Sequence, residues 1–149
     1  MTQEEKQLLL KDLSARLPYG VLVKCSDTEG ILRYDSYRLH EMSEDGSYLA
    51  LSAVDIPHGV SNLDLEFCDI KPYLRPMSSM TEEEKEELYH YYCKEIADNL
   101  STPNLTWELK CCVSNSFGTD WLNEHYFDYR GLIEKGLALE APEEMYKND

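Results

Sequence analysis

The chain has 149 residues, of which 42% are hydrophobic, so it has the size of one globular domain and can bury a core of its own. Its 29 acidic and 14 basic residues give a formal net charge of −15 at pH 7. Such a charge repels phosphate groups and argues against non-specific binding to nucleic acid or to anionic membranes. No apolar run of the roughly 18 residues that a membrane-spanning helix needs occurs, and the first residues are charged rather than apolar. We therefore expect a cytoplasmic protein without a membrane partner.

The negative charge is unevenly divided along the chain. Residues 1–75 carry 8 bases and 13 acids, whereas residues 76–149 carry 6 bases and 16 acids. The second part is therefore the more acidic one.

Five cysteines form an odd set without C-x-x-C spacing: Cys25, Cys68, Cys93, Cys111 and Cys112. A disulfide framework needs pairs, and an intracellular protein keeps its thiols reduced. We expect reduced cysteines, in agreement with a cytoplasmic location.

The first helix is indicated by a capping box, in which Thr2 and Glu5 satisfy each other's backbone N–H groups. Four leucines then fall on one helical face, at positions 9, 10, 13 and 17. Because Pro18 cannot continue the hydrogen-bond ladder, the helix is predicted to end near Arg16 or Leu17.

Four short strands are predicted next, at residues 21–25, 31–39, 47–54 and 65–74. The segment 55–62 is predicted as a Pro/Gly loop, and Pro72 and Pro76 restrict the last strand to an edge or to irregular structure. Four strands in about 55 residues favour a curled antiparallel sheet or a small open barrel, with the first helix over one end.

A second helix is predicted from Thr81, which caps it together with Glu84. The helix should bury the side chains of Leu88, Tyr89, Tyr92 and Ile96. Residues 76–80, just before it, are the predicted joint within a single domain 1–149, between a helix and small sheet in 1–75 and the remainder in 81–149.

The last third of the chain is predicted to contain a strand and two short helices. Residues 105–113 alternate apolar and polar side chains, as in a strand with one buried face. A capped short helix is predicted from Thr119, and a helix of one or two turns over 128–136, ended by Gly136. The acidic tail after Pro142 is predicted to be loose.

Candidate metal and thiol chemistry is weak in this sequence. His90 and Cys93 are three residues apart on the predicted helix and could share a metal, but two more ligands would be needed. Cys111 and Cys112 are the only obvious candidates for these further ligands. Because adjacent residues of a strand point to opposite faces, at most one of the two could join the site. A surface histidine beside a buried thiol is favoured, and we expect neither a metal nor a cofactor. No cysteine lies at a helix N-terminus or in another activating position.

The carboxylates are explained better by structure than by catalysis. Residues 82–87 form a capping and solvated run, and Asp120 and Asp128 suit caps or turns. No Gly-rich phosphate loop, G-x-S-x-G or H-E-x-x-H motif occurs. The sequence therefore favours a non-enzymatic role.

An aromatic cluster near the end of the chain is the best candidate for a partner surface. It consists of Trp121, Tyr126, Phe127, Tyr129 and Arg130, with His125 among them. Large rigid rings and arginine dominate binding hot spots. The alternative, which the burial habits of such rings favour, is that they cap the core.

Three stretches of the chain resemble a family of small uncharacterised bacterial proteins found largely in prophages and other mobile elements. They are YGVLVKC at 19–25, IKPYLRPMSSMTEEEKEEL at 70–88 and DWLNEHYFDYRGLIEKGLALEAPEEMY at 120–146. The resemblance implies a cytoplasmic accessory protein of a mobile element. It implies no activity and no catalytic residues.

Together these patterns predict an α+β fold: an N-terminal helix, a four-stranded antiparallel curled sheet or small open barrel, then a helix, a strand and short C-terminal helices. The leading hypothesis is a non-enzymatic protein-interaction module of a bacterial mobile element. One alternative is an acidic nucleic-acid mimic that inhibits a nucleic-acid-binding protein of the host or of a competitor. A small enzyme with an unrecognised site is the other alternative.

Overall fold

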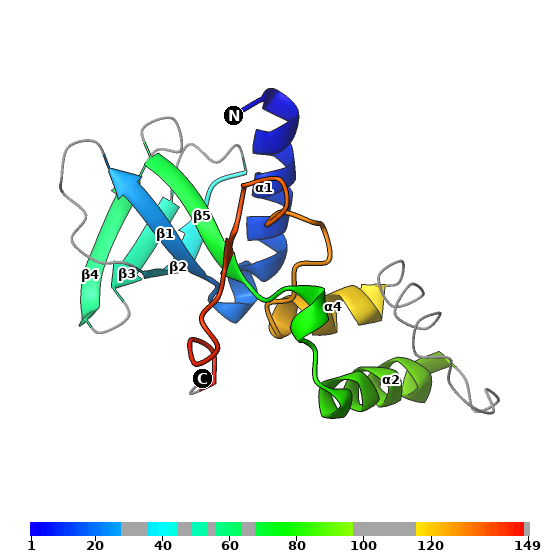
Figure 1. Cartoon of the computed structure of the whole chain (residues 1–149). Helices are drawn as coiled ribbons and strands as arrows, with labels where there is room; N and C mark the ends of the chain where they lie inside the picture. Colours follow the sequence, from blue (N-terminus) through cyan, green and yellow to red (C-terminus); the bar gives the residue numbers. More distant parts are fainter. Residues whose placement is uncertain (28–35, 45–48, 54–55, 64–67, 97–115, 148–149) are drawn as a thin grey trace.

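The computed structural model describes residues 1–27, 36–44, 49–53, 56–63, 68–96 and 116–147, and it has an α+β fold (Figure 1). In chain order the elements are α1 (Gln3–Arg16), η1 (Leu17–Tyr19), β1 (Leu22–Asp27), β2 (Tyr37–Met42), β3 (Leu49–Ala53), β4 (Ile56–Leu63), β5 (Cys68–Leu74), η2 (Met77–Ser79), α2 (Glu82–Ile96), α4 (Ser116–Glu124) and β6 (Leu139–Glu140). Of these, η1 and η2 are single 3-10 turns.

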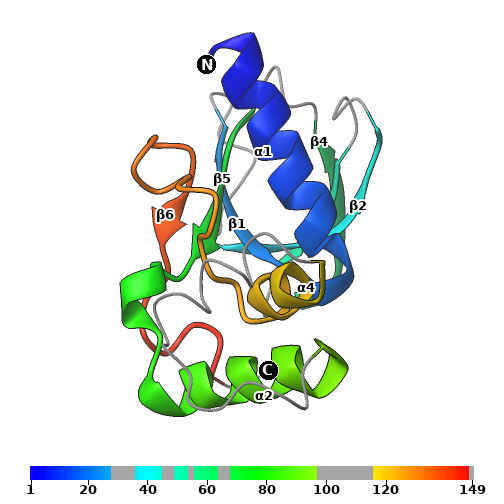
Figure 2. The same cartoon turned by 90° about the vertical axis from the view of Figure 1, so that its right-hand side faces the viewer.

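The strands form one sheet in the order β4-β3-β2-β1-β5-β6. Strands β1 to β5 pair antiparallel with their neighbours, and the short β6 pairs parallel with the end of β5. The predicted antiparallel sheet is thus present, with more strands than expected. Figures 1 and 2 show that the sheet is curled and that α1 lies across it.

Strand β4 corrects the prediction of a loop at 55–62. On β3, Ser52 pairs with Val60 and Ala53 pairs with Ile56, so the register shifts between these two pairs. The intervening residues 57–59, which include a proline and a glycine, lie in this irregular stretch, where no regular ladder pairing is required. The turn-forming residues therefore bend the strand without ending it.

Strand β5 accommodates Pro72 as the sequence predicted. Pro72 pairs with Val23 of β1 on one side, while β6 covers only Tyr73 and Leu74 on the other. The proline therefore lies where β5 is an outer strand of the described sheet.

Helix α1 begins and ends as predicted. Thr2 Oγ1 accepts from the Glu5 N–H and the Glu5 carboxylate accepts from the Thr2 N–H, at 3.1 and 2.7 Å. Leu9 and Leu13 are buried against the sheet, and the chain leaves through η1 to Gly20, whose φ is +64°. A side chain is strained at that φ, so the glycine permits the sharp turn into β1.

The buried side chains form two clusters. The sheet cluster joins α1, β1, β2, β3 and β5 to the C-terminal region and consists of Leu9, Leu13, Val21, Val23, Cys25, Tyr37, Leu39, Leu49, Leu51, Ile70, Leu74, Tyr126, Leu132, Leu137 and Ala138. The helix cluster joins α2 to α4 and consists of Met80, Leu88, Trp121, Leu122 and Phe127. Helix α4 contacts both α1 and α2, so it connects the two clusters.

Helix α2 has the predicted capping box, in which Thr81 Oγ1 accepts from the Glu84 N–H at 3.1 Å. Leu88 is buried as expected, and Tyr89 is half-buried. The side chains of Tyr92 and Ile96, and the predicted strand 105–113, lie outside the described residues. The proposed joint at 76–80 contains η2 and stays a prediction.

The C-terminal region differs from the prediction in three places. Helix α4 begins at Ser116, so Thr119 and Asp120 lie inside the helix and do not cap it. Residues 128–136 form turns and not a helix, because Gly131 has a φ of +72°, far from the helical value. Asp128 is a capping residue of these turns, and its carboxylate accepts from the N–H groups of Leu132 and Ile133.

The tail is anchored, contrary to the expectation of a loose end. The Ala141 N–H donates to the Leu74 carbonyl at 2.8 Å, and the Tyr146 hydroxyl donates to the Tyr73 carbonyl at 2.7 Å. The Tyr146 ring also stacks on Tyr126, with centroids 3.7 Å apart. Among the described residues no helix is long and apolar enough to cross a membrane.

Candidate functional site

The predicted aromatic cluster lies largely inside the molecule. Trp121 and Phe127 are 2% and 0% exposed and belong to the helix cluster, and Tyr126 belongs to the sheet cluster. Tyr129 and Arg130 are half-buried. The buried rings therefore cap the core, which is the alternative that the sequence favoured. In this conformation they cannot contact a partner. Partner contacts at Tyr129 and Arg130 stay a prediction.

Trp121 and its neighbours join α4 to α2. The Trp121 ring stacks on His125 at 3.9 Å and on Phe127 at 5.9 Å between centroids. Its Nε1 donates to Glu87 Oε1 at 3.4 Å, and His125 Nε2 lies 3.6 Å from the same oxygen. The aromatic cluster therefore holds α2 in place.

Arg130 belongs to a buried polar network. The Asp12 carboxylate is fully buried and accepts from Arg16 Nε at 2.9 Å and from Arg130 Nη1 at 2.7 Å. Arg16 Nη2 also donates to the Phe127 carbonyl at 2.7 Å. The network fixes α1 to the turn after α4, with the Tyr129 ring beside both guanidinium groups.

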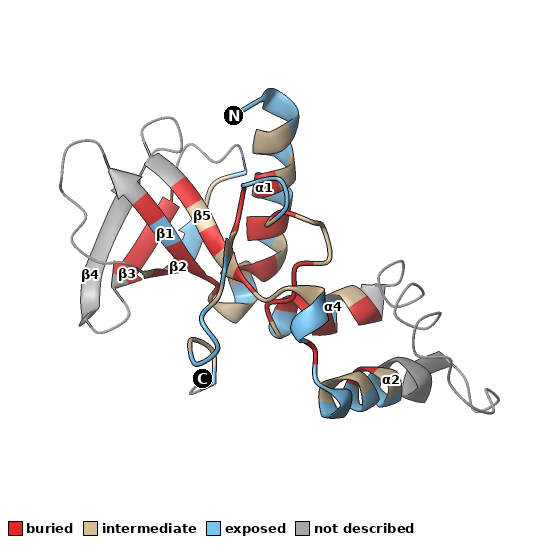
Figure 3. Cartoon of the chain, viewed as in Figure 1, coloured by how far each residue is buried: buried red, intermediate tan, exposed pale blue. Residues whose placement is uncertain are grey.

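Helix α2 presents two exposed stripes at i, i+4, i+8 spacing. One consists of Glu82, Glu86 and His90, and the other of Glu83, Glu87 and Tyr91. Tyr91 is 41% exposed, and Met1 is the other large apolar side chain that is exposed in the described part of the chain. We call these six residues the α2 face. It is pale blue over the described turns of α2 in Figure 3.

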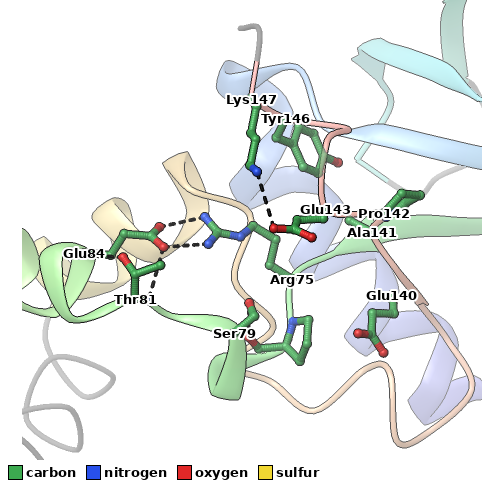
Figure 4. Close-up of a pocket in the computed structure, with 11 residues that line it drawn as sticks. Arg75, Ser79, Thr81, Glu84, Glu140, Ala141, Pro142, Glu143, Tyr146 and Lys147 are labelled. Carbon is green, nitrogen blue, oxygen red and sulfur yellow. Dashed lines mark hydrogen bonds and ion pairs between the residues drawn. The ribbon is translucent and has the colours of Figure 1, made fainter.

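Arg75, at the end of β5, fixes the start of α2. Its guanidinium donates two hydrogen bonds of 2.7 Å to the Glu84 carboxylate (Figure 4). The same guanidinium lies 4.2 Å from the Phe127 ring centroid. Although burial raises the pKa of Glu84, the hydrogen bonds from Arg75 and from the Thr81 N–H outweigh it and leave that pKa below its ordinary value. Glu84 is therefore a structural carboxylate.

Two pockets flank the side chains of Arg75 and Tyr146. The larger one, about 550 Å³, lies between the start of α2, the end of β5 and the C-terminal segment (Figure 4). It is lined by Arg75, Pro76, Ser79, Thr81, Glu84, Glu140, Ala141, Pro142, Glu143, Tyr146 and Lys147. The smaller one, about 380 Å³, is lined by Tyr19, Arg75, Glu124, His125, Tyr126 and Tyr146, and we call it the tyrosine pocket.

Tyr126 reaches the tyrosine pocket through an unusual backbone conformation. After α4, the Phe127 N–H donates to the Leu122 carbonyl and the Tyr126 N–H to the Asn123 carbonyl, the pattern of a Schellman motif. Tyr126 has a φ of 64° at the position where such motifs usually carry glycine. The strain of about 1 kcal/mol is offset by the stacked and buried ring.

The described residues contain no group of three metal-ligating side chains. His90 is exposed and lies edge-on to Tyr89, and the Cys93 side chain is outside the described residues. Cys25 is a buried thiol of the sheet cluster. The expectation that the chain binds no metal stays a prediction.

Comparisons were made with protein-family models, curated proteins and solved structures. None of them matches this chain. The candidate site is therefore defined by its own geometry: the α2 face, the larger pocket of about 550 Å³ and the tyrosine pocket.

Sequence reasoning missed both the α2 face and the tyrosine pocket. The α2 face had a detectable signal in the sequence, because Glu83, Glu87 and Tyr91 are spaced by one helical turn and therefore lie along one side of the helix. The tyrosine pocket had none, since Tyr19, Tyr126 and Tyr146 are far apart in the chain and meet only in the fold.

Proposed function

We propose that this chain is a non-enzymatic protein-interaction module that contacts a basic partner surface through the α2 face. The observation that carries the proposal is the exposed Tyr91 beside four exposed carboxylates on one helix. A tyrosine supplies contact area with a polar handle, and the carboxylates supply steering and orientation. The mobile-element context rests on the three resembling segments and belongs to the same proposal.

The structural setting of α2 supports this role. The side chains of Glu83 and Glu86 form no ion pair or hydrogen bond with described residues. Lys85, the base between them, is half-buried and paired with Glu82. Like charges one turn apart destabilise an isolated helix by about 0.2–0.5 kcal/mol per pair. A basic partner would remove that repulsion, so charge complementarity favours binding there.

Nucleic-acid mimicry is the second candidate, favoured by the same carboxylates. A mimic depends on charge alone, so its binding should fall steeply with salt and should not need Tyr91. An interface anchored by Tyr91 should keep more of its affinity at high salt.

A pull-down with matched charge reversals tests the proposal. The variant Glu83→Lys/Glu86→Lys reverses two side chains of the α2 face, and Glu41→Lys/Glu134→Lys makes the same change in net charge on β2 and in the turn near the start of α1. Loss of a retained partner is expected only for the first variant. Equal retention by both variants, with both folded, would refute the proposed surface.

A third variant, Tyr91→Ala, separates the two candidate functions. The interaction module predicts about a tenfold loss of affinity, as for a hot-spot tyrosine. The mimic predicts affinity close to that of the parent chain.

A further inference from the structure

The chemistry of the tyrosine pocket points to a specific kind of occupant. It is lined by the aromatic residues Tyr19, Tyr126, Tyr146 and His125, together with the exposed residue Glu124. Aromatic faces attract cations, because the ring quadrupole is negative above the plane, and a nearby carboxylate adds to the attraction.

The polar donors of the pocket are largely committed elsewhere. The Tyr126 hydroxyl donates to the Tyr19 carbonyl, and the Tyr146 hydroxyl donates to the Tyr73 carbonyl. His125 Nδ1 donates to the Trp121 carbonyl at 2.9 Å. An anionic ligand would therefore find few donors, whereas the aromatic rings and the Glu124 carboxylate suit a cation.

Arg75 is the one permanent positive charge in the lining. Its guanidinium is engaged by both oxygens of Glu84 at 2.7 Å and lies over the Phe127 ring. This ion pair offsets the charge of Arg75, so the guanidinium does not oppose a cation as a lone one would.

Negative charge also lies around the mouth of the pocket. Burial, and after it the charges of Asp120 and Glu124, raise the pKa of Tyr19, and Tyr91 contributes in the same direction. His125 lines the pocket, and its Nε2 lies 3.6 Å from Oε1 of Glu87, a residue of the α2 face. The pocket and the α2 face therefore meet at Glu87.

We propose that the tyrosine pocket binds a cationic side chain, arginine or lysine, of the partner whose basic surface contacts the α2 face. The inference rests on the proposed function and adds its anchor: one positively charged side chain inserts among Tyr19, Tyr146 and His125, with Glu124 as its counter-ion. The Tyr126 ring stacks on Tyr146, with centroids 3.7 Å apart, and so supports that ring in the lining.

Peptides of matched shape test this site on the full chain. The probes are acetylated and amidated Gly-Gly-Arg-Gly-Gly and the same peptide with citrulline, which has the shape of arginine without its charge. Two-dimensional NMR of the ¹⁵N-labelled protein should show saturable shifts at Tyr19, Glu124–Tyr126 and Tyr146 with the arginine peptide. The citrulline peptide should bind about tenfold more weakly.

Variants locate the binding in the pocket. Tyr19→Leu removes an aromatic face and Glu124→Gln removes the counter-ion, and each should weaken the arginine peptide by about threefold or more. Tyr19→Phe should retain binding, and Glu134→Gln is the control for loss of one exposed carboxylate. Equal affinity for arginine and citrulline, shifts confined to other residues, or unchanged affinity in Glu124→Gln would each overturn the inference.

The outcomes distinguish this inference from the proposed function. A partner that depends on the α2 face but is unaffected by Tyr19→Leu and Glu124→Gln would leave the function standing and overturn the pocket. Charge-selective peptide binding without any partner that depends on Glu83 and Glu86 would support the pocket and overturn the function.

Discussion

Asp12 is the residue on which the join between α1 and the C-terminal region depends most. Its buried carboxylate accepts from both Arg16 and Arg130, while Arg16 Nη1 has no hydrogen-bond partner among the described residues. The buried group therefore carries more positive than negative charge. Removing the one carboxylate would leave two guanidinium groups without their counter-ion.

Asp12→Ala should destabilise the protein by about 3–5 kcal/mol, the cost of breaking a buried ion pair by removing one partner. Replacing both members of the helical pair, as in Asp12→Leu/Arg16→Met, should cost less, because no charge of that pair is left buried. Urea unfolding followed by circular dichroism measures both. A double variant less stable than Asp12→Ala would contradict this view of the network.

At the scale of single residues, the sequence predicted what depends on near neighbours. The capping boxes at Thr2 and Thr81 are decided within three residues, and both are present. The role of Trp121 could not be predicted from its neighbours in the sequence, because its burial depends on contacts with α2 and with Phe127. The ring that the sequence suggested as a binding residue is thus part of the core.

Among the elements, α2 is held by two different kinds of contact. Leu88 packs into the helix cluster, and the Glu84 carboxylate pairs with Arg75 at the end of β5. The pKa of Glu84 is lowered in the folded protein, against the opposing effect of burial. A carboxyl with a lowered folded-state pKa stabilises the fold above its unfolded pKa and loses that contribution as pH falls through the folded value.

The free energy of unfolding should therefore fall as the pH drops below about 4.5, and part of that fall should be absent in Glu84→Gln. Glu86→Gln is the matched control, because the Glu86 side chain is exposed and forms no ion pair or hydrogen bond with the described residues. Urea denaturation at pH 3, 4, 5 and 6 gives the free energy of unfolding of each protein as a function of pH. If this free energy fell equally with pH in the parent chain and in Glu84→Gln, the ion pair would not stabilise α2.

Strand β4 and the C-terminal tail were predicted wrongly from the sequence for the same physical reason. Residues 55–62 have the composition of a loop, yet pairing with β3 makes β4 of them and leaves the proline and glycine in the irregular stretch. The tail has the composition of a loose end, yet Tyr146 finds partners on β5 and β1. In both cases long-range contacts outweigh local propensity.

For the whole molecule, the exposed lysines are separated from the α2 face. Residues 82–91, the part of α2 whose side chains are described, expose four carboxylates and no lysine, whereas the exposed lysines among the described side chains lie at positions 11, 24, 135 and 147. With a net charge of −15, repulsion between carboxylates acts against the folded state.

Added salt should consequently stabilise the protein. Raising KCl from about 0.02 to 0.5 M shortens the screening length from over 20 Å to under 5 Å, so the repulsion fades and Tm should rise by a few degrees. The less negative variant Glu83→Lys/Glu86→Lys should respond less. A fall of Tm with salt would mean that exposed ion pairs outweigh the repulsion.

The central claim is that the α2 face is where a partner binds, and photo-crosslinking from that face tests it most directly. The full chain carrying Tyr91→p-benzoylphenylalanine is irradiated in lysate beside the same chain carrying the label at Glu134, in the turn near the start of α1. We predict a discrete adduct from position 91 that disappears when Glu83→Lys/Glu86→Lys is added, and none from position 134. An adduct from position 134 with none from position 91 would contradict the account.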